Sequence, residues 1–279
     1  MYCASDGIEI YSGLGGGSFP RAVSITVKDS RFNWNRRHGG SGDAISGAQF
    51  INVEFNDNGQ DLNAEDALDS GGRGARSQGY LYGNGIDMEG YGVGSANTNI
   101  SFTGITALRN VRTGILFYDT VAATDPGFRM SSSIVIAGCK VDCGNGKDGN
   151  GQPYAIEFTS TPAHKTLGPI YADITLSDNL IVGWVSLRAV DSAAISGGEI
   201  DDPQGMLGNL DHATNVTVSM NRGNREFYAG NSTVNYLEQS VSTVNDNRFD
   251  TTSIESLAQP AVASALAPTS VRPVSEALP

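Results

Sequence analysis

The sequence has few basic residues and no long apolar segment. Lysine and arginine together number 18, against 30 aspartates and glutamates, so the formal net charge is −12. Nucleic-acid binding needs a basic face for the phosphates, so this balance argues against nucleic acid as a partner. A neutral or acidic polysaccharide stays possible, because local basic residues can line a groove. No apolar run approaches the roughly 20 residues of a membrane span, and we expect none.

Cysteine is scarce as well, with three in the chain, and an odd number cannot form a disulfide framework. Cys139 and Cys143 have the i, i+4 spacing of one strand face. No histidine or further cysteine lies near enough in the sequence to complete a zinc set. We therefore interpret both as buried apolar thiols and expect neither a metal nor another cofactor.

The first residues, MYCASDG, lack the basic and apolar regions of a secretory signal. They pass directly into GIEIY at residues 7–11, which has the pattern of a strand. We therefore expect the sequence to begin inside a longer solenoid.

A short strand motif recurs along the chain. It reads GIDM at residues 85–88, GILF at 114–117 and AIEF at 155–158, and a longer alternating segment such as NISFTGITALRN at 99–110 follows each copy. Recurrence at this interval is typical of a repeat architecture. Because the units contain strands and turns but no helical period, they indicate a coil of parallel strands.

The predicted fold class is therefore all-β, a right-handed single-stranded parallel β-helix over residues 1–252. Residues 57–79 form a polar, Gly-rich interruption, and insertions in solenoids often fall on the binding face. Residues 253–279 hold four of the ten prolines. Proline donates no ladder hydrogen bond, so we expect an irregular C-terminal arm or linker there.

Alternation within the strands predicts which side chains point inward. The inward pairs are Ile86/Met88, Ile115/Phe117, Ile156/Phe158 and Leu187/Ala189, and a second stack contains Ile100/Phe102, Ile134/Ile136, Ile174/Leu176 and Val216/Val218. The outward pairs are Asp87/Glu89, Leu116/Tyr118, Glu157/Thr159 and Arg188/Val190. The small residue that opens each strand, Ser186 in the last copy, should lie at a sharp bend.

These segments resemble right-handed parallel β-helix proteins of the pectate-lyase-like group, and most of all bacteriophage tailspikes that cut host surface polysaccharides. The resemblance covers roughly residues 7–250 and depends on asparagine-bounded segments such as 99–110, each leading into a Gly-Ile strand such as 114–117. The Asp-Gly-x-x-Asp-Asp element of the group is not found, and no catalytic motif matches. The resemblance implies a homotrimer joined to other tail proteins, a bacterial capsule or O-antigen as substrate, and a virion or extracellular location.

Three carboxylates are candidate catalytic residues. Glycoside hydrolysis uses two acids, about 5–5.5 Å apart for retention or about 6.5–9.5 Å apart for inversion. Asp87 and Glu89 lie two residues apart on one strand and point the same way, at about 6.5–7 Å by backbone rise. Asp87 and Glu157 should occupy one outward column at about 9.6 Å by strand spacing. We predict hydrolysis by Asp87, Glu89 and Glu157.

Residues near this column are candidates for substrate binding. Glu9 should lie in the same column on an earlier coil, and the tyrosines Tyr11, Tyr91 and Tyr118 could stack on sugar faces. Arg112 and Arg188 are candidates for contacting an acidic sugar. The basic turn at residues 36–40, RRHGG, could also meet an acidic sugar, although a solvated turn is the simpler interpretation.

Two other functions stay open. A polysaccharide lyase or epimerase would use a base such as Arg112, Arg109 or Arg188, with Asp87 or Glu157 binding Ca²⁺. A non-catalytic receptor-binding or structural tail fibre would use the same solenoid, with the acids as solvated surface.

Overall fold

The computed structural model describes residues 6–11, 23–59, 83–90, 94–120, 123–143, 154–161, 167–201 and 208–219, together with the backbone of 222–223, 227–230, 234–236 and 254–256. Within these ranges the protein is all-β and contains no helix. The described part of the chain therefore has no helix that could span a bilayer.

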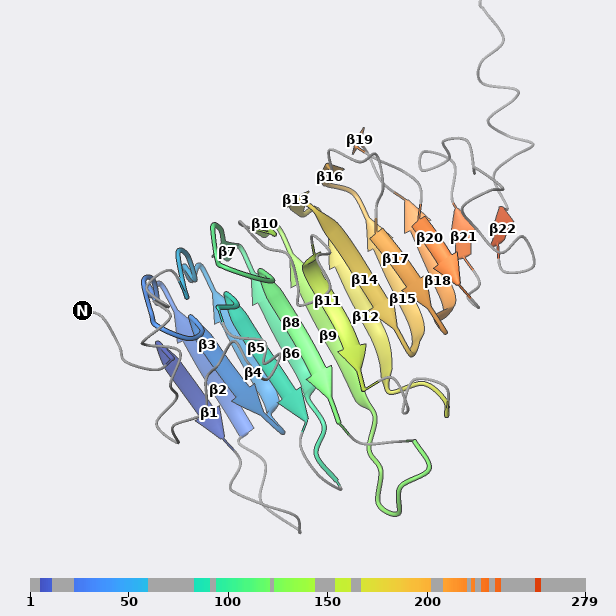
Figure 1. Ribbon diagram of the computed structural model, residues 1–279, viewed down its shortest axis with the longest axis horizontal. Coiled ribbons are helices and arrows are strands. Elements are labelled where there is room, and N and C mark those ends of the chain that lie inside the picture. The colour runs from blue at the N-terminus through green and yellow to red at the C-terminus, as the bar shows by residue number, and fades with distance from the viewer. Residues whose placement is uncertain are drawn as a thin grey trace, which may run out of the picture.

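The strands form three sheets, and neighbouring strands in each sheet are parallel (Figure 1). The first sheet contains β1 (Ile8–Tyr11), β3 (Gly40–Asp43), β5 (Ile86–Gly90), β8 (Ile115–Asp119), β11 (Tyr154–Ser160), β14 (Trp184–Arg188), β17 (Gly208–Asp211) and β20 (Phe227–Gly230). The second contains β2 (Val23–Lys28), β4 (Ser46–Ile51), β6 (Thr98–Thr103), β9 (Ser131–Ala137), β12 (Tyr171–Ser177), β15 (Val190–Ser196), β18 (Thr214–Ser219), β21 (Val234–Tyr236) and β22 (Ile254–Ser256). The third contains β7 (Thr106–Ala107), β10 (Lys140–Asp142), β13 (Leu180–Val182), β16 (Glu199–Asp201) and β19 (Arg222–Gly223).

The order in which the chain visits the sheets is regular. From β5 to β20 it passes through the first, second and third sheets in turn, and each strand pairs with the equivalent strand of the next pass. Figure 1 shows the strands following one another along the long axis, with β7, β10, β13, β16 and β19 along one edge. This arrangement is compatible with the predicted parallel β-helix.

Apolar side chains form stacks between the sheets, as predicted. In the first sheet the aligned inward residues include Ile86, Ile115 and Ile156, and in the second Ile100, Ile134 and Ile174. All six are buried in one core cluster. The rings of Phe117 and Phe158 stack with centroids 4.7 Å apart, and such pairs add to the stabilisation from area burial.

An asparagine ladder joins the turns that precede the first sheet. Asn35 donates through its side chain to Asn58 Oδ1, and Asn58 donates to Asn110 Oδ1, each at 2.9 Å. The ladder ends where Asn110 Nδ2 donates to the carbonyl of Phe55 at 2.8 Å. The same oxygens accept the backbone N–H groups of Asn35 and Asn58, so the ladder satisfies buried polar groups that a turn would leave unpaired.

The predicted basic turn at residues 36–40 leads directly into strand β3, which the sequence analysis did not predict. Gly40–Asp43 pairs with β1 and β5 in full register, although its sequence, GSGD, contains no apolar residue. The reason is space, since a Cβ on Gly42 would collide with the side chains of Ile45 and Met88, which fill the core at this level. The strand is thus invisible to any pattern of apolar residues.

The sequence analysis also missed the turn of the coil that contains β15, and it misaligned residues 186–190 with the preceding strands. Val190–Ser196 forms β15 after a single left-handed residue, Ala189, so no loop marks its start. Val190 is therefore buried rather than outward. Ser186 aligns with Glu157, so it occupies an outward position and not the opening bend.

The predicted C-terminal arm lies mostly outside the described residues, as does most of the interruption at 57–79. Ile254–Ser256 is described, and it pairs with β21 at the edge of the second sheet.

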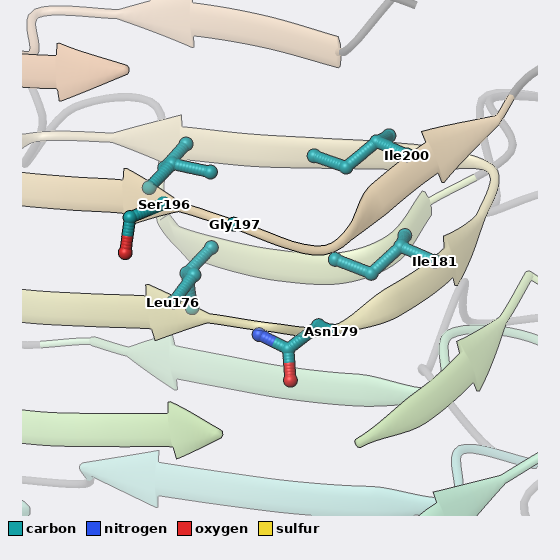
Figure 2. A pocket seen from close by; sticks show the side chains of 7 residues that line it. Leu176, Asn179, Ile181, Ser196, Gly197 and Ile200 are labelled. Carbon is teal, nitrogen blue, oxygen red and sulfur yellow. The ribbon is translucent and has the colours of Figure 1, made fainter. Parts of the chain in front are cut away.

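A small gap lies at the corner between the second and third sheets (Figure 2). Leu176, Ile181 and Ile200 line it, and it has no room for a water molecule. Asn179 closes one side, accepting from the Cys139 N–H and donating to the Ile136 carbonyl, both at 2.9 Å. The gap is therefore a feature of core packing and not a binding site.

Candidate functional site

Two columns of outward side chains run across the first sheet. We define the acid column by the aligned residues Glu9, Ser41, Asp87, Leu116, Glu157 and Ser186. The predicted alignment of Glu9, Asp87 and Glu157 is therefore confirmed. Strand pairing places Asp87 and Glu157 two strands apart, with Leu116 between them.

The second column lies two residues further along each strand. We define this tyrosine column by the aligned residues Tyr11, Asp43, Glu89, Tyr118 and Thr159. Arg188 reaches the end of the column, where its Nη1 donates to Thr159 Oγ1 at 3.4 Å. Tyr91, the remaining predicted tyrosine, lies outside the described residues.

The centre of the acid column is buried, whereas the tail-fibre alternative treated these acids as solvated surface. Asp87 is 2% exposed, Leu116 0% and Glu157 4%. Leu116 is nevertheless absent from the core cluster between the sheets, as expected for the opposite face of its strand. The outer face of the first sheet is therefore covered at this level, and a carboxyl there is removed from water.

Asp87 is held by two hydrogen-bond donors on the same oxygen. Asn84 Nδ2 donates to Asp87 Oδ2 at 3.1 Å, and His38 Nε2 lies 3.3 Å from that oxygen. The other oxygen, Oδ1, is buried and has no hydrogen-bond partner among the described residues. Any proton on this carboxyl is therefore best placed on Oδ1, since both neighbours of Oδ2 are donors.

The backbone fixes the tautomer of His38. The N–H of Asn84 donates to His38 Nδ1 at 3.2 Å, which places the ring proton on Nε2, facing Asp87. Burial lowers the pKa of His38 well below its ordinary value, and the positive charges of Arg37 and Arg112 lower it further. The imidazole is therefore neutral near pH 7 and acts as an N–H donor.

Asp87 has the electrostatic character of an acid that stays protonated. Burial raises the pKa of Asp87 well above its ordinary value, and the charge of Glu89 raises it further. The hydrogen bond from Asn84 acts in the opposite direction. Glu89 itself is half-buried on the same strand, so two neighbouring carboxyls have different environments.

Glu157 belongs to a second cluster, on β11 and β14. Its Oε1 lies 3.8 Å from Arg188 Nη1, and the guanidinium of Arg188 also covers the ring of Tyr154 at 5.2 Å from the centroid. Tyr154 in turn packs edge-on against Trp184, with centroids 6.0 Å apart. This cluster combines an ion pair with two aromatic rings on the outer face of the sheet.

The tyrosine column is the more open part of this face. Tyr11 is exposed, while Glu89 and Tyr118 are half-buried. Burial raises the pKa of Tyr118, and the charges of Glu89 and Asp87 raise it further. Burial likewise raises the pKa of Tyr11, followed by its hydrogen bond with Glu9. Both phenols therefore stay neutral hydrogen-bonding groups at neutral pH.

The other predicted arginines occupy different places. Arg112 is buried just before β8, and its charge acts on His38. Arg109 pairs with Asp57 through two bonds of 2.7 Å, on the turn that carries the asparagine ladder. The described residues include no group of three or more His, Cys, Asp or Glu side chains that could hold a metal ion.

His38 and Asn84 are the site residues that sequence reasoning missed. His38 is 2% exposed, so the interpretation of residues 36–40 as a solvated turn is wrong for this residue. His38 lies two residues before β3, and Asn84 lies two residues before β5. The two segments are joined by the Gly39 N–H, which donates to the Asn84 carbonyl at 3.1 Å. The available signal was Leu116, an apolar residue between two acids, which indicates a covered face.

Comparison of this chain with protein-family models, curated proteins and solved structures found no match.

Proposed function

We propose that this protein is a right-handed parallel β-helix of the tailspike type that binds and depolymerises a bacterial surface polysaccharide by glycoside hydrolysis. The repeated passage through three parallel sheets supports the fold. The observation that carries the proposed reaction is the pairing of Asp87, whose Oδ1 has no hydrogen-bond partner in the described part of the chain, with Glu89 on the same strand.

In this mechanism Asp87 is the general acid. Its proton lies on Oδ1 and passes to the glycosidic oxygen as the bond to the anomeric carbon breaks. Glu89, the more exposed carboxylate, removes a proton from the attacking water. Environments that separate the pKa values of two acids are the usual basis for assigning such roles.

The spacing of the pair favours inversion. The two Cα atoms are about 6.5–7 Å apart along the strand, because side chains two positions apart share a face. Inverting enzymes place their carboxyls about 6.5–9.5 Å apart, which leaves room for a water molecule. Glu157 and Arg188 contribute to substrate binding in this scheme, together with Glu9, Tyr11 and Tyr118.

The experiment is to measure reducing ends released from capsule and O-antigen preparations. Asp87→Asn and Glu89→Gln should each lower the rate by at least 100-fold, within the usual range for general acid–base catalysis. Asp119→Asn is the matched control, because Asp119 is also a buried acid of the first sheet but lies in neither column. Unchanged rates in both site variants would remove this proposal.

A lyase or epimerase is the second candidate, and one observation favours it. His38 is neutral and lies close enough to Arg37 and Arg112 for both charges to lower its pKa. Two cations at this position are suited to neutralising the carboxylate of a bound uronate, and Arg112 is a candidate base from the sequence analysis. Formation of an unsaturated uronate, detected by its absorbance, would select a lyase over hydrolysis.

Assembly and location follow the same proposal. We expect a homotrimer attached to other tail proteins, in the virion or outside the cell. If polysaccharide binds without any product, a receptor-binding or structural tail fibre replaces the enzyme.

A further inference from the structure

Trp34, Asp57 and Arg109 occupy equivalent positions on three successive turns, and we call them the Trp34 ladder. The N–H of Trp34 donates to the carbonyl of Asn56 at 3.1 Å, and the N–H of Asp57 donates to that of Leu108 at 2.9 Å. The flanking asparagine ladder has the same offsets. The three residues are therefore stacked neighbours along the axis of the sheets.

All three residues have left-handed backbones, with φ of 62° for Trp34, 58° for Asp57 and 54° for Arg109. Aspartate tolerates this region, but a bulky residue there is a genuine outlier. The turn therefore requires a conformation that glycine or asparagine would adopt more easily, yet the first position is tryptophan. Backbone strain of this kind concentrates where a side chain has a function.

Folding removes the indole of Trp34 from water only in part. It is 51% exposed, and it makes no ring contact with another described residue. Half-exposed tryptophan in a strained backbone is not explained by core packing, because the large apolar area of the ring stays partly in water.

The other two members of the ladder present a planar polar pair. Arg109 Nε and Nη2 donate to Asp57 Oδ1 and Oδ2, both at 2.7 Å, in a bidentate arrangement. The side chain of Arg109 is 60% exposed. Asp57 is only 7% exposed, so the exposed polar group of the ladder is the guanidinium of Arg109, which the carboxylate holds in place.

From this juxtaposition we infer a saccharide-binding site on the Trp34 ladder, which takes a pyranose ring on the indole and its neighbouring hydroxyls on the Asp57–Arg109 pair. A pyranose has one face of C–H groups that packs on an aromatic ring, and its hydroxyls accept hydrogen bonds from guanidinium groups. The pair carries no net charge, so it does not select an anionic ligand. This inference stands whether or not Asp87 cleaves the polymer.

Tryptophan fluorescence reports on this site, because the chain has two tryptophans and Trp184 is buried. The full chain carrying Trp184→Phe has Trp34 as its single indole. An array of bacterial capsule and O-antigen oligosaccharides identifies a bound saccharide, which is then titrated into this variant. We expect the Trp34 emission to shift to shorter wavelength and become protected from acrylamide.

Trp34→Gly separates binding from structure. Glycine accepts a φ of 62° without strain, so the melting temperature should stay equal or rise. Affinity for the saccharide should fall by at least tenfold in this variant and in Asp57→Ala, and stay within twofold in Val135→Thr, an exposed position of the second sheet. Unchanged affinity of Trp34→Gly, a melting temperature lower by several degrees, or no binding to any saccharide of the array would each overturn the inference.

Discussion

His38 Nε2 lies 3.3 Å from Asp87 Oδ2, and both side chains are 3% exposed. His38 lies two residues before β3 and Asp87 lies on β5, and the two meet because these neighbouring strands pair in parallel. Their contact occupies one oxygen of Asp87 with donors and leaves the other for a proton. This arrangement leads to the first prediction.

Replacing His38 should affect the reaction through Asp87. His38→Gln keeps an N–H donor and an acceptor in the same space, whereas His38→Leu has neither. We expect His38→Leu to lower kcat at least tenfold and to shift the pH dependence of the rate, while His38→Gln keeps most of the activity. A pH–rate profile that is identical in all three proteins, with folding verified by circular dichroism, would show that His38 does not position the acid.

The ion pair between Glu157 and Arg188 should act on substrate binding. Glu157→Gln and Arg188→Met should each raise KM several-fold and change kcat by less than threefold. Because the two groups contact each other, the double variant should lose less than the sum of the single effects. A loss of kcat as large as that of Asp87→Asn would instead make Glu157 one of the reacting acids.

A buried acid at the end of β8 should make stability depend on pH. Burial raises the pKa of Asp119 to about 7, even though Ser131 donates a hydrogen bond to it. The folded protein therefore holds a proton that the unfolded chain releases above about pH 4. The stabilisation from this proton is complete below pH 4. It is lost as the pH rises to about 7, which lowers the free energy of unfolding by on the order of 4 kcal/mol.

Asp119→Asn should remove this dependence. The free energies of unfolding of the variant and the wild type should be similar at pH 4. The free energy of unfolding of the variant should increasingly exceed that of the wild type as the pH rises to 8. Urea unfolding at the two pH values measures the difference. A constant gap between the proteins would mean that Asp119 titrates as it does in water.

The aromatic stack in the core should carry a large part of the stability. Phe158 is fully buried and contacts the rings of Phe117 and Tyr171. Phe158→Ala should lower the free energy of unfolding by about 3–5 kcal/mol, because it removes apolar burial and leaves a cavity. Val135→Thr, at an exposed position of the second sheet, is the control and should change stability by about 0.5 kcal/mol or less.

Much of the fold could be predicted because the repeating strands bury isoleucine and phenylalanine on one face. The alignment of Ile86, Ile115 and Ile156 follows from period-two alternation, and the alignment of Asp87 with Glu157 follows from the same register. Side-chain positions that recur from coil to coil are therefore readable from the sequence.

The features that could not be predicted lie where the strands contain no pattern of apolar residues. Strand β3 consists of small and polar residues, because Ile45 and Met88 already fill the space inside it. His38 was consequently assigned to a solvated turn instead of a buried site. Burial of the outer face was equally hidden, since alternation tells which face a side chain occupies but not what covers that face.

The configuration of the product at the anomeric carbon tests the central claim most directly. Proton NMR of the first sugar released from a capsule or O-antigen substrate distinguishes inversion from retention before mutarotation. With Asp87 as acid and Glu89 as base, we predict the inverted anomer from the wild type and at least 100-fold slower product release from Asp87→Asn. A retained anomer, an unsaturated uronate, or equal product from Asp87→Asn would contradict the account.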